Sequence, residues 1–390
     1  MLRGEMGEPA AQAMRLLEAI GKAYGAERLI KVRSAHVSGI SYNTIGEAGL
    51  GFLQRMALDD GRCKALTTIN PAGMELDDPG KLGISRDFAE KQFQIIRCFE
   101  NFKARITCTC TPYLSGNNPL MGDPVAWSES SAVIFVNSVI GASSNREGAP
   151  SSLASALTGR TPYYGYHLEE NRRPNVEVSL ESDLRTDLDF SLFGYVIGEK
   201  VVGVPFICGG AARPSLGEIK IFGAAAAASG DLALYHWDNL TPESRRYKTC
   251  LDNVERVSVD RGELEDALDR LSTGGRADAI CLGCPHLSLS ELGEIASLVK
   301  GKRLRRPLLC FTSRMVYQRA LKKGFIGSIK RAGGKVIRDT CMVVSPLRES
   351  GIDVMETNSC KAAYYAPNLN GVSVSLSDMR HSIQEALKTA

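Results

Sequence analysis

The sequence predicts an α/β protein built from several lobes, each containing a parallel sheet. Apolar runs of strand length alternate with amphipathic segments of helix length, most regularly over residues 254–345. Several strand-like runs in the first two thirds of the chain end in loops rich in Gly, Ser, Asn and Pro. The chain has 390 residues, of which 44% are hydrophobic, so it can bury more than one core.

The N-terminal part begins with an amphipathic helix within residues 1–25, which lack the apolar core of a signal peptide. A second helix is predicted over residues 84–102, and the small-residue run at 223–230 indicates a tightly packed third. Strands that run into polar loops are predicted at residues 28–39, 64–73, 104–112 and 131–145. We assign these elements to an N-terminal lobe or lobes, residues 1–235, whose polar loops suit a substrate pocket.

A C-terminal lobe of βαβ units is predicted over residues 236–390, after a linker at residues 233–246. Its expected strands are 254–260, 277–287, 305–313 and 334–344, and its expected helices are 261–273, 288–301 and 315–334. The second strand is expected to end in a Gly-Cys-Pro turn, and Ser288 or Ser290 suits the N-cap of the next helix. Such connections indicate parallel strands, whose ligands bind beyond the carboxyl ends.

Charge and hydropathy exclude several classes of partner. The 47 basic and 44 acidic residues give a formal net charge of +3, without a long charged tail or a stripe of basic and aromatic side chains. We therefore expect no nucleic-acid or membrane partner, and small molecules or proteins as ligands. The sequence contains no run of about 18 uncharged apolar residues, so we expect a cytoplasmic protein.

Eleven cysteines in 390 residues are too dilute for a disulfide scaffold. Cysteines that sit singly among apolar or helical residues, or inside a strand, are typical of small buried side chains, and these are Cys63, Cys98, Cys208, Cys250, Cys281 and Cys310. Cys110, Cys284 and Cys341 instead follow strand-like runs and precede turns, so they can meet at one crevice. Three thiolates suit an iron–sulfur cluster with one open iron, although three unrelated turn cysteines give the same pattern. Zinc is disfavoured because no second CxxC or HxxxH follows at zinc-site spacing.

Eight stretches of the sequence resemble one known family. They are HVSGISYNTIGEAGLGFL, TTINPAGME, TCTPYLSGNNPLMGD, AWSESSAVIFVNSVIGASSNREG, TPYYGYHLEENRR, GCPHLSLSEL, DTCMVV and TNSCKAAYYAP. Together, between about residues 30 and 370, they resemble the large subunit of aconitase X. The resemblance implies an aconitase-like fold and a hydro-lyase with an iron–sulfur cluster, a [4Fe-4S] cluster in the archaeal branch.

Members of this family differ in substrate. Archaeal members dehydrate (R)-5-phosphomevalonate to trans-anhydromevalonate 5-phosphate in a modified mevalonate pathway, and bacterial members dehydrate cis-3-hydroxy-L-proline. The set of motifs favours the archaeal reaction, and the proline reaction is the alternative.

The family's cluster is bound by three cysteines, and the matching residues are Cys110 in CTPY, Cys284 in GCPH and Cys341 in DTC. Two alternatives stay open. Cys108 shares a face with Cys110 if both lie on a strand, because residues two apart point the same way. Cys360 occupies a position in NSCK where we expect the family to have a small residue.

The matching motifs also supply candidates for substrate binding and catalysis. The catalytic candidates are Glu129 and His167. The substrate-binding candidates are Ser38, Ser41, Asn117, Asn118, Asn137, Asn145, Arg146 and Lys361. Residues of these types also form turns, cap helices or lie on the surface as ordinary cations, so the sequence leaves both roles open.

Aconitase-like enzymes take a catalytic serine from a swivelling domain, and the resemblance places no such domain in this chain. It therefore implies a small-subunit partner, in a heterodimer or a multiple of it. Two other functions stay open. One is a cluster-sensing regulatory protein, although the near-neutral charge disfavours RNA binding. The other is a hydrolase that uses Cys284 beside His286, which leaves Cys110 and Cys341 unexplained.

Overall fold

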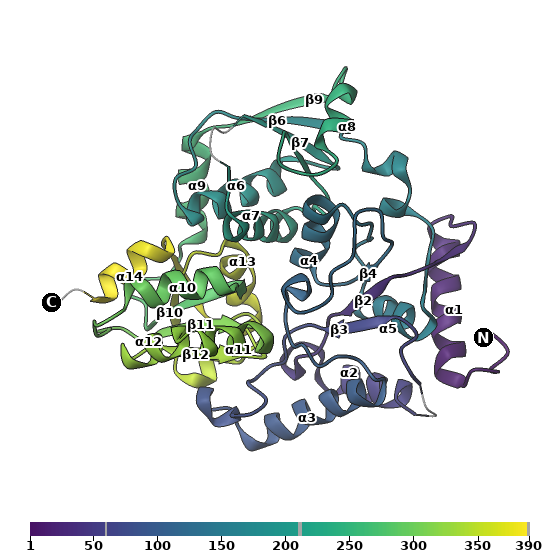
Figure 1. The fold of residues 1–390 in the computed structure, drawn as a ribbon, viewed down its shortest axis with the longest axis horizontal. Coiled ribbons are helices and arrows are strands. Elements are labelled where there is room, and N and C mark those ends of the chain that lie inside the picture. The colour runs from purple at the N-terminus through teal and green to yellow at the C-terminus, as the bar shows by residue number, and fades with distance from the viewer. Residues whose placement is uncertain (59–60, 210–212, 388–390) are drawn as a thin grey trace.

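The computed structural model describes residues 1–58, 61–209 and 213–387, and these form four sheets in three lobes. In Figure 1 the N-terminal lobe lies at the lower right, the middle of the chain at the top and the C-terminal lobe at the left. Each sheet of more than two strands is parallel throughout. The predicted α/β class with several parallel sheets is therefore confirmed.

The first lobe is built on a short sheet with strand order β3-β2-β4. These strands are β2 (Ser34–Val37), β3 (Leu66–Ile69) and β4 (Ala126–Trp127), while β1 (Leu29–Lys31) and β5 (Arg160–Pro162) form a separate antiparallel pair. The helices are α1 (Glu8–Ala23), α2 (Tyr42–Met56), α3 (Arg86–Asn101), α4 (Ser130–Phe135) and α5 (Ala149–Thr158). The helices predicted within residues 1–25 and 84–102 are confirmed by α1 and α3, and Ser85 caps α3 by accepting a hydrogen bond from the Phe88 N–H.

The second lobe has a sheet with strand order β8-β7-β6-β9. Its strands are β6 (Val176–Leu180), β7 (Pro205–Gly209), β8 (His236–Trp237) and β9 (Glu255–Val259), and its helices are α6 (Asp187–Lys200), α7 (Leu216–Ser229), α8 (Ser244–Tyr247) and α9 (Arg261–Leu271). Small residues let α6 and α7 approach closely, since a Cβ atom on Gly194 would lie 2.2 Å from the Phe222 carbonyl oxygen. The helix predicted at 223–230 is the second half of α7.

The third lobe has a five-stranded sheet with order β12-β11-β10-β13-β14. Its strands are β10 (Ala279–Leu287), β11 (Leu308–Thr312), β12 (Lys335–Arg338), β13 (Val354–Thr357) and β14 (Ser373–Leu376). Its helices are α10 (Leu289–Leu298), α11 (Arg314–Lys322), α12 (Phe325–Arg331), α13 (Cys360–Asn370) and α14 (Met379–Leu387). Ser288, and not Ser290, is the N-cap of α10, and the helix predicted at 315–334 is divided at Gly324, which has a φ of 77°.

Two strands predicted in the first lobe do not form. Residues 131–145 begin with α4 and continue as a π-helical segment (Val136–Ile140). The apolar part of this run is buried on all sides, and a short run of that kind does not distinguish a helix from a buried strand by periodicity. Residues 104–112 make only an isolated bridge, between Arg105 and Thr68.

The predicted C-terminal strands differ in extent from the observed ones. β10 continues past Gly283 to Leu287, with a cis Cys284–Pro285 peptide and a register shift against β11, so the predicted Gly-Cys-Pro turn is wrong. β12 ends at Arg338, before the DTC motif. β9 pairs with β6 in the second lobe and not with β10. The division into residues 1–235 and 236–390 stays a prediction, and β8 and β9, which follow this boundary, pair with β7 and β6, which precede it.

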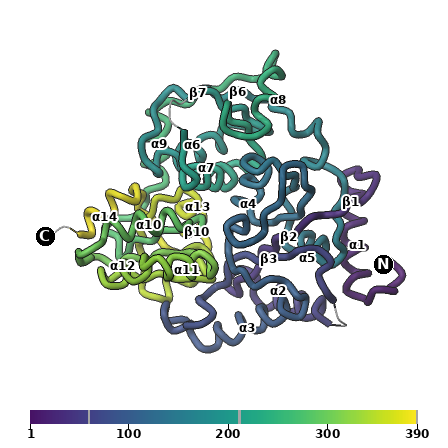
Figure 2. Tube along the Cα trace, in the orientation of Figure 1, coloured from purple at the N-terminus to yellow at the C-terminus, as the bar shows by residue number. Residues whose placement is uncertain are grey.

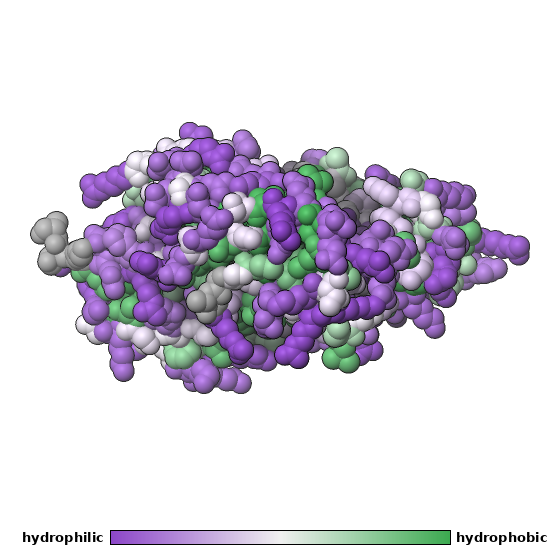
Figure 3. All heavy atoms as spheres, turned by 90° about the horizontal axis from the view of Figure 1, so that it is seen from above, coloured by the Kyte–Doolittle hydropathy of each residue, from purple (hydrophilic) through white to green (hydrophobic). Residues whose placement is uncertain are grey.

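The largest hydrophobic core joins the second and third lobes. Helix α7 contacts both α4 and α13 where the lobes meet, as the chain trace in Figure 2 shows. The face seen in Figure 3 is mostly hydrophilic. Within the described ranges no helix has the length and apolar character needed to cross a membrane.

Candidate active site

Three separate segments bring Cys110, Cys284 and Cys341 to one site. Cys110 precedes a 3₁₀ turn (Pro112–Leu114) of the first lobe, Cys284 lies near the end of β10, and Cys341 follows β12. All three side chains are buried, and none is in a disulfide. Cys341 interacts electrostatically with both other thiols, so the site lies where the first and third lobes meet.

Cys108 and Cys110 have different surroundings despite their spacing. Cys108 has a φ of 41°, so the shared strand face expected from the sequence is absent. Its side chain packs in the core of the first lobe. The Sγ atom of Cys110 instead accepts a hydrogen bond from the His286 N–H at 3.2 Å. This geometry favours Cys110 over Cys108 as the thiol of the site.

Burial raises the pKa of all three thiols, that of Cys341 to about 12. The ammonium group of Lys361 acts in the opposite direction on Cys110 and Cys284, and Ser359 does so by a hydrogen bond to Cys284. Backbone amides lower the pKa of Cys341 in the same way. Thiols that are protonated when free, and that lie beside such donors, suit a cationic metal centre that displaces their protons.

The donor set has the chemistry of an iron–sulfur site. Such clusters are held by cysteine thiolates, and the three thiols here are buried, outside any disulfide and supplied by separate segments. Among the residues that the structure describes, no three His, Cys, Asp or Glu side chains are grouped so as to hold a single metal ion.

Cys360 has its contacts in the second lobe. It is the first residue of α13, its backbone N–H donates to Ser191 Oγ at 2.9 Å, and its thiol also interacts with that hydroxyl. Ser191 belongs to α6. The geometry therefore ranks Cys360 behind Cys341 as a cluster ligand.

A buried ion pair between Glu129 and Lys361 lies beside the thiols. The Nζ atom of Lys361 is also 3.2 Å from Ser130 Oγ and 3.4 Å from Ser131 Oγ. The other Glu129 oxygen accepts from Asn70 Nδ2 at 2.7 Å. Burial acts to raise the pKa of Glu129, but Lys361 and the hydrogen bonds outweigh it and lower the pKa to about 2. Glu129 is therefore charged at neutral pH and is a weak proton acceptor in this arrangement.

Two residues of this site were not among the predicted ones. Asn70 follows β3, and its side chain lies between Glu129, to which it donates, and the buried His36, with which it interacts. Ser359 is the N-cap of α13 and interacts with Cys284. Both lie in stretches that carry the family resemblance, TTINPAGME and TNSCKAAYYAP, which was the signal that could have identified them.

Ser38 and Ser41 lie in the loop between β2 and α2, close to the site. Ser41 Oγ donates to the Val344 carbonyl at 2.8 Å, which joins this loop to the segment that follows Cys341. The backbone N–H of Ser38 donates to Ser128 Oγ at 2.7 Å, and Ser128 directly precedes Glu129. The structure therefore places these two predicted residues against the segments that follow Cys341 and precede Glu129.

The contacts of the four asparagines predicted to bind substrate are not with the three cysteines. Asn117, Asn137 and Asn145 are buried, and their Nδ2 groups donate to main-chain carbonyls of the first and second lobes. Asn118 is exposed. The buried amides hold loops in place through these bonds, and the substrate-binding role of the four asparagines stays a prediction.

Arg146 and His167 also find their partners elsewhere. Arg146 pairs with Asp231 and donates to a main-chain carbonyl near the end of α7. His167 Nδ1 lies 3.1 Å from Ser143 Oγ, and burial together with Arg172 lowers the pKa of His167 to about 4. Of the two predicted catalytic residues, the structure brings Glu129 to the thiols but not His167.

His286, two residues after Cys284, is fully buried. Its Nε2 is 2.9 Å from the Thr340 carbonyl oxygen and its Nδ1 is 3.0 Å from Thr109 Oγ1. Burial lowers its pKa to about 4, so the ring is neutral. Because both ring nitrogens have partners other than Cys284, the imidazole is not placed to take a proton from that thiol. The hydrolase alternative therefore lacks the base that the sequence offered for it, His286.

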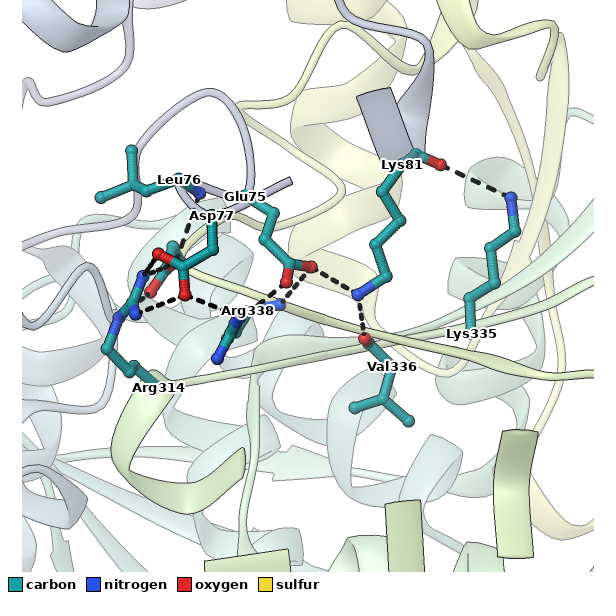
Figure 4. Close-up of polar contacts among 9 residues, drawn as sticks. Glu75, Leu76, Asp77, Lys81, Arg314, Lys335, Val336 and Arg338 are labelled. Atoms are coloured by element: carbon teal, nitrogen blue, oxygen red, sulfur yellow. Dashed lines mark hydrogen bonds and ion pairs between the residues drawn. The ribbon is translucent and has the colours of Figure 1, made fainter. Parts of the chain in front are cut away.

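An ion-pair network joins the first and third lobes next to the site (Figure 4). Glu75 is 3% exposed and accepts from Arg338 Nε at 2.9 Å. Arg314 binds Asp77 at 2.8 Å and the buried Asp339 at 2.5 Å. The first-lobe carboxylates of residues 75 and 77 thus hold the end of β12, from which the chain continues directly into the DTC motif.

Comparisons with known protein families give the same family for the first, middle and last parts of the chain. Three family models match it in succession, described as the aconitase X first domain over residues 1–170, second domain over 174–269 and third domain over 277–388. This chain belongs to the aconitase X family. The resemblance identified from the sequence motifs is confirmed.

Curated members of the aconitase X family match along the whole chain. The phosphomevalonate dehydratase large subunit of Methanocaldococcus jannaschii is 44% identical, over 100% of this chain and 97% of that protein. The cis-3-hydroxy-L-proline dehydratase of Pseudomonas aeruginosa is 33% identical, over 99% of this chain and 68% of that protein. The crystal structure of the holo form of Thermococcus kodakaraensis aconitase X superimposes with a TM-score of 0.91 at 40% identity, covering 99% of this chain and 97% of that chain. The aconitase-like fold is thus confirmed.

Proposed function

We propose that this chain is the large subunit of a hydro-lyase that converts (R)-5-phosphomevalonate into trans-anhydromevalonate 5-phosphate in a modified mevalonate pathway. The observation that carries the proposal is an identity of 41–44% to four archaeal phosphomevalonate dehydratase large subunits, over at least 98% of this chain. The two cis-3-hydroxy-L-proline dehydratases are 32–33% identical, and the chain covers 64–68% of their length. Cis-3-hydroxy-L-proline is the second candidate substrate.

The proposed cofactor is a [4Fe-4S] cluster held by Cys110, Cys284 and Cys341. Their burial, their free thiols and their mutual electrostatic coupling support this assignment. When bound, the cluster would supply an open iron that acts as a Lewis acid on the departing hydroxyl group.

Lys361 is the proposed binding group for the substrate carboxylate. Its ammonium group is buried and charged, and a cation in such a site interacts strongly with an anion. Glu129 and the two serines beside it orient the ammonium group, and Asn70 in turn orients Glu129. Ser38 and Ser41 order the adjoining loop.

Removal of water also requires a base that takes a proton from the carbon next to the carboxylate. Glu129 is a weak base while Lys361 holds it, because its pKa is about 2. We therefore propose that the base comes from a small subunit, as the name "large subunit" of the relatives implies a partner. In this proposal the partner carries the swivelling domain and forms a heterodimer, or a multiple of it, in the cytoplasm.

The test is an anaerobic assay of this chain co-expressed with the small subunit and reconstituted with iron and sulfide. (R)-5-phosphomevalonate and cis-3-hydroxy-L-proline are offered in parallel, and loss of water is followed by mass spectrometry. Turnover of the phosphate compound supports the proposal, and turnover of the proline alone replaces it with the second candidate. If neither reacts although the visible absorbance of a cluster is present, the dehydratase function is overturned.

A further inference from the structure

His286 contacts the segments that carry all the proposed cluster ligands. It follows Cys284 by two residues and lies at the end of β10, fully buried. Its backbone N–H donates to Cys110 Sγ at 3.2 Å. Its ring bonds to two threonines, each of which directly precedes one of the other two cysteines.

The ring hydrogen bonds have a defined direction. The Thr340 carbonyl oxygen can only accept, so the His286 Nε2 carries the proton and donates to it. In the neutral ring Nδ1 is then an acceptor, and the Thr109 hydroxyl donates to it. Thr109 Oγ1 in turn accepts from the Thr111 N–H at 3.1 Å. Every group in this chain of bonds has a partner, which fixes the orientation of the imidazole.

These bonds join segments that lie far apart in the sequence. Thr109 precedes Cys110 in the first lobe and is 177 residues from His286. Thr340 precedes Cys341 after β12 and is 54 residues from His286. Through these two contacts and its own place in β10, the imidazole links the three segments directly.

We propose that His286 is a positioning residue that sets the spacing of Cys110, Cys284 and Cys341 before a cluster is inserted. The inference rests on the proposed function, because it takes these cysteines as the cluster ligands. Segments that bind a rigid cluster must be ordered first, and hydrogen bonds that order them in advance reduce the entropy lost on binding. The ring bonds to the residues before two of the cysteines and not to their sulfurs, so its loss acts on the placement of the cysteines. Loss of outer-shell contacts at metal sites typically weakens metal binding about 10–100-fold.

Two substitutions separate the two ring contacts. An Asn side-chain oxygen lies near the position of Nδ1, so His286→Asn keeps the contact with Thr109 and loses that with Thr340. A Gln side-chain nitrogen lies near the position of Nε2, so His286→Gln does the reverse. The matched control is His236→Asn, which removes a 2.8 Å contact between another fully buried imidazole Nε2 and a main-chain carbonyl, in the second lobe.

The first measurement uses the full chain without metal. Alkylation rates of Cys110 and Cys341 are followed by mass spectrometry. We expect the rate at Cys341 to rise severalfold in His286→Asn and the rate at Cys110 to rise severalfold in His286→Gln, with neither rate changed in the control. Thr109→Val removes the hydroxyl that donates to the ring, together with the bond that this hydroxyl accepts from the Thr111 N–H, and we expect faster alkylation of Cys110 in it. This variant keeps the test decisive if the His286 variants fail to fold.

The second measurement is the iron and sulfide content after anaerobic reconstitution, and the rate at which a chelator removes iron. We expect removal to be about tenfold faster or more in the His286 variants, with the control at the wild-type rate. Wild-type alkylation and iron-loss rates in all variants at these positions would overturn the proposal. If the wild-type chain takes up no cluster, the proposed cofactor fails, while the alkylation rates still decide whether His286 positions the cysteines.

Discussion

Lys361 is the buried cation that holds Glu129 ionised beside the proposed cluster site. We expect Lys361→Met to lower the free energy of unfolding by about 3–5 kcal/mol, because it leaves a buried carboxylate without its counter-ion. Activity should fall by about 100-fold or more, since the proposed carboxylate-binding group is lost. Chemical denaturation and the dehydration rate measure the two effects.

The double variant Lys361→Met with Glu129→Gln is the matched control for this pair. It removes both charges, so we expect most of the lost stability to return while activity stays low. If the double variant were no more stable than the single one, the unpaired charge would not be the cause of the instability. Activity near that of the wild type in Lys361→Met would contradict the proposed substrate role.

Single serine substitutions test which cysteines bind the proposed cluster. We expect Cys341→Ser to lose most of its bound iron, because a hydroxyl is a poor replacement for a thiolate in a cluster. Cys360→Ser and Cys108→Ser should keep the wild-type iron content, since the Cys360 thiol interacts with Ser191 of the second lobe and Cys108 packs in the core of the first lobe. Iron analysis and the visible absorbance of each purified variant decide between them, and loss of iron in Cys360→Ser would make that residue the ligand.

At the scale of elements, the sequence predicted helices correctly where apolar side chains recur with the period of a helix. The amphipathic α1, α3 and α9 agree with their predicted ranges because each has one apolar face. α4 was predicted as a strand, since its β-branched and aromatic residues are buried on all sides and show no period. Its helical start depends on Glu129, which accepts a hydrogen bond from the Ser131 N–H. The sequence offered that residue both as a site candidate and as a capping carboxylate, and the structure shows it as the cap of α4.

Buried ion pairs join the loop at residues 75–81 to β12. Glu75 accepts from Lys81 at 2.5 Å and from Arg338 at 2.9 Å, and all three side chains are at least 85% buried. We expect Glu75→Gln to lower the first thermal transition by several degrees, because the buried Lys81 loses its carboxylate and Arg338 keeps only its pair with Asp77. Differential scanning calorimetry measures this shift.

The control for this junction is Glu18→Gln in α1, which breaks the exposed pair between Glu18 and Lys22. Exposed pairs of this kind contribute at most about 0.5 kcal/mol, so the transition should hardly move. Equal shifts in the Glu75 and Glu18 variants would show that the buried network is no more stabilising than a surface pair.

At the scale of the whole molecule, the sequence predicted which cysteines meet but not what surrounds them. Strand ends and family motifs pointed to Cys110, Cys284 and Cys341, although Cys110 in fact follows no strand. The contacts of Asn70 with Glu129 and of His286 with Thr340 depend on how the lobes are packed. No local pattern records such long-range contacts, so they required the structure.

Asp187 makes the stability of the assembled lobes depend on pH. It accepts from Asn358 Nδ2 at 2.7 Å and from the Met379 N–H at 3.3 Å, so it joins the second and third lobes. Burial raises its pKa to about 6, and repulsion from Asp378 acts in the same direction. Its ordinary pKa is 3.8, so between pH 3.8 and about 6 the folded protein binds more protons than the unfolded chain. The stability contributed by this carboxyl group therefore falls as the pH rises through that window.

We expect Asp187→Asn to remove this fall, because an amide does not ionise. Relative to the wild type, the variant should gain thermal stability as the pH is raised from below 3.8 to above 6. Scanning calorimetry across that range measures the difference, with Asp183→Asn at an exposed position as the control. If the difference between Asp187→Asn and the wild type did not change with pH, the carboxyl group would already be ionised throughout the window. The contact with Asn358 would then stabilise the junction of the two lobes as a charge-assisted hydrogen bond.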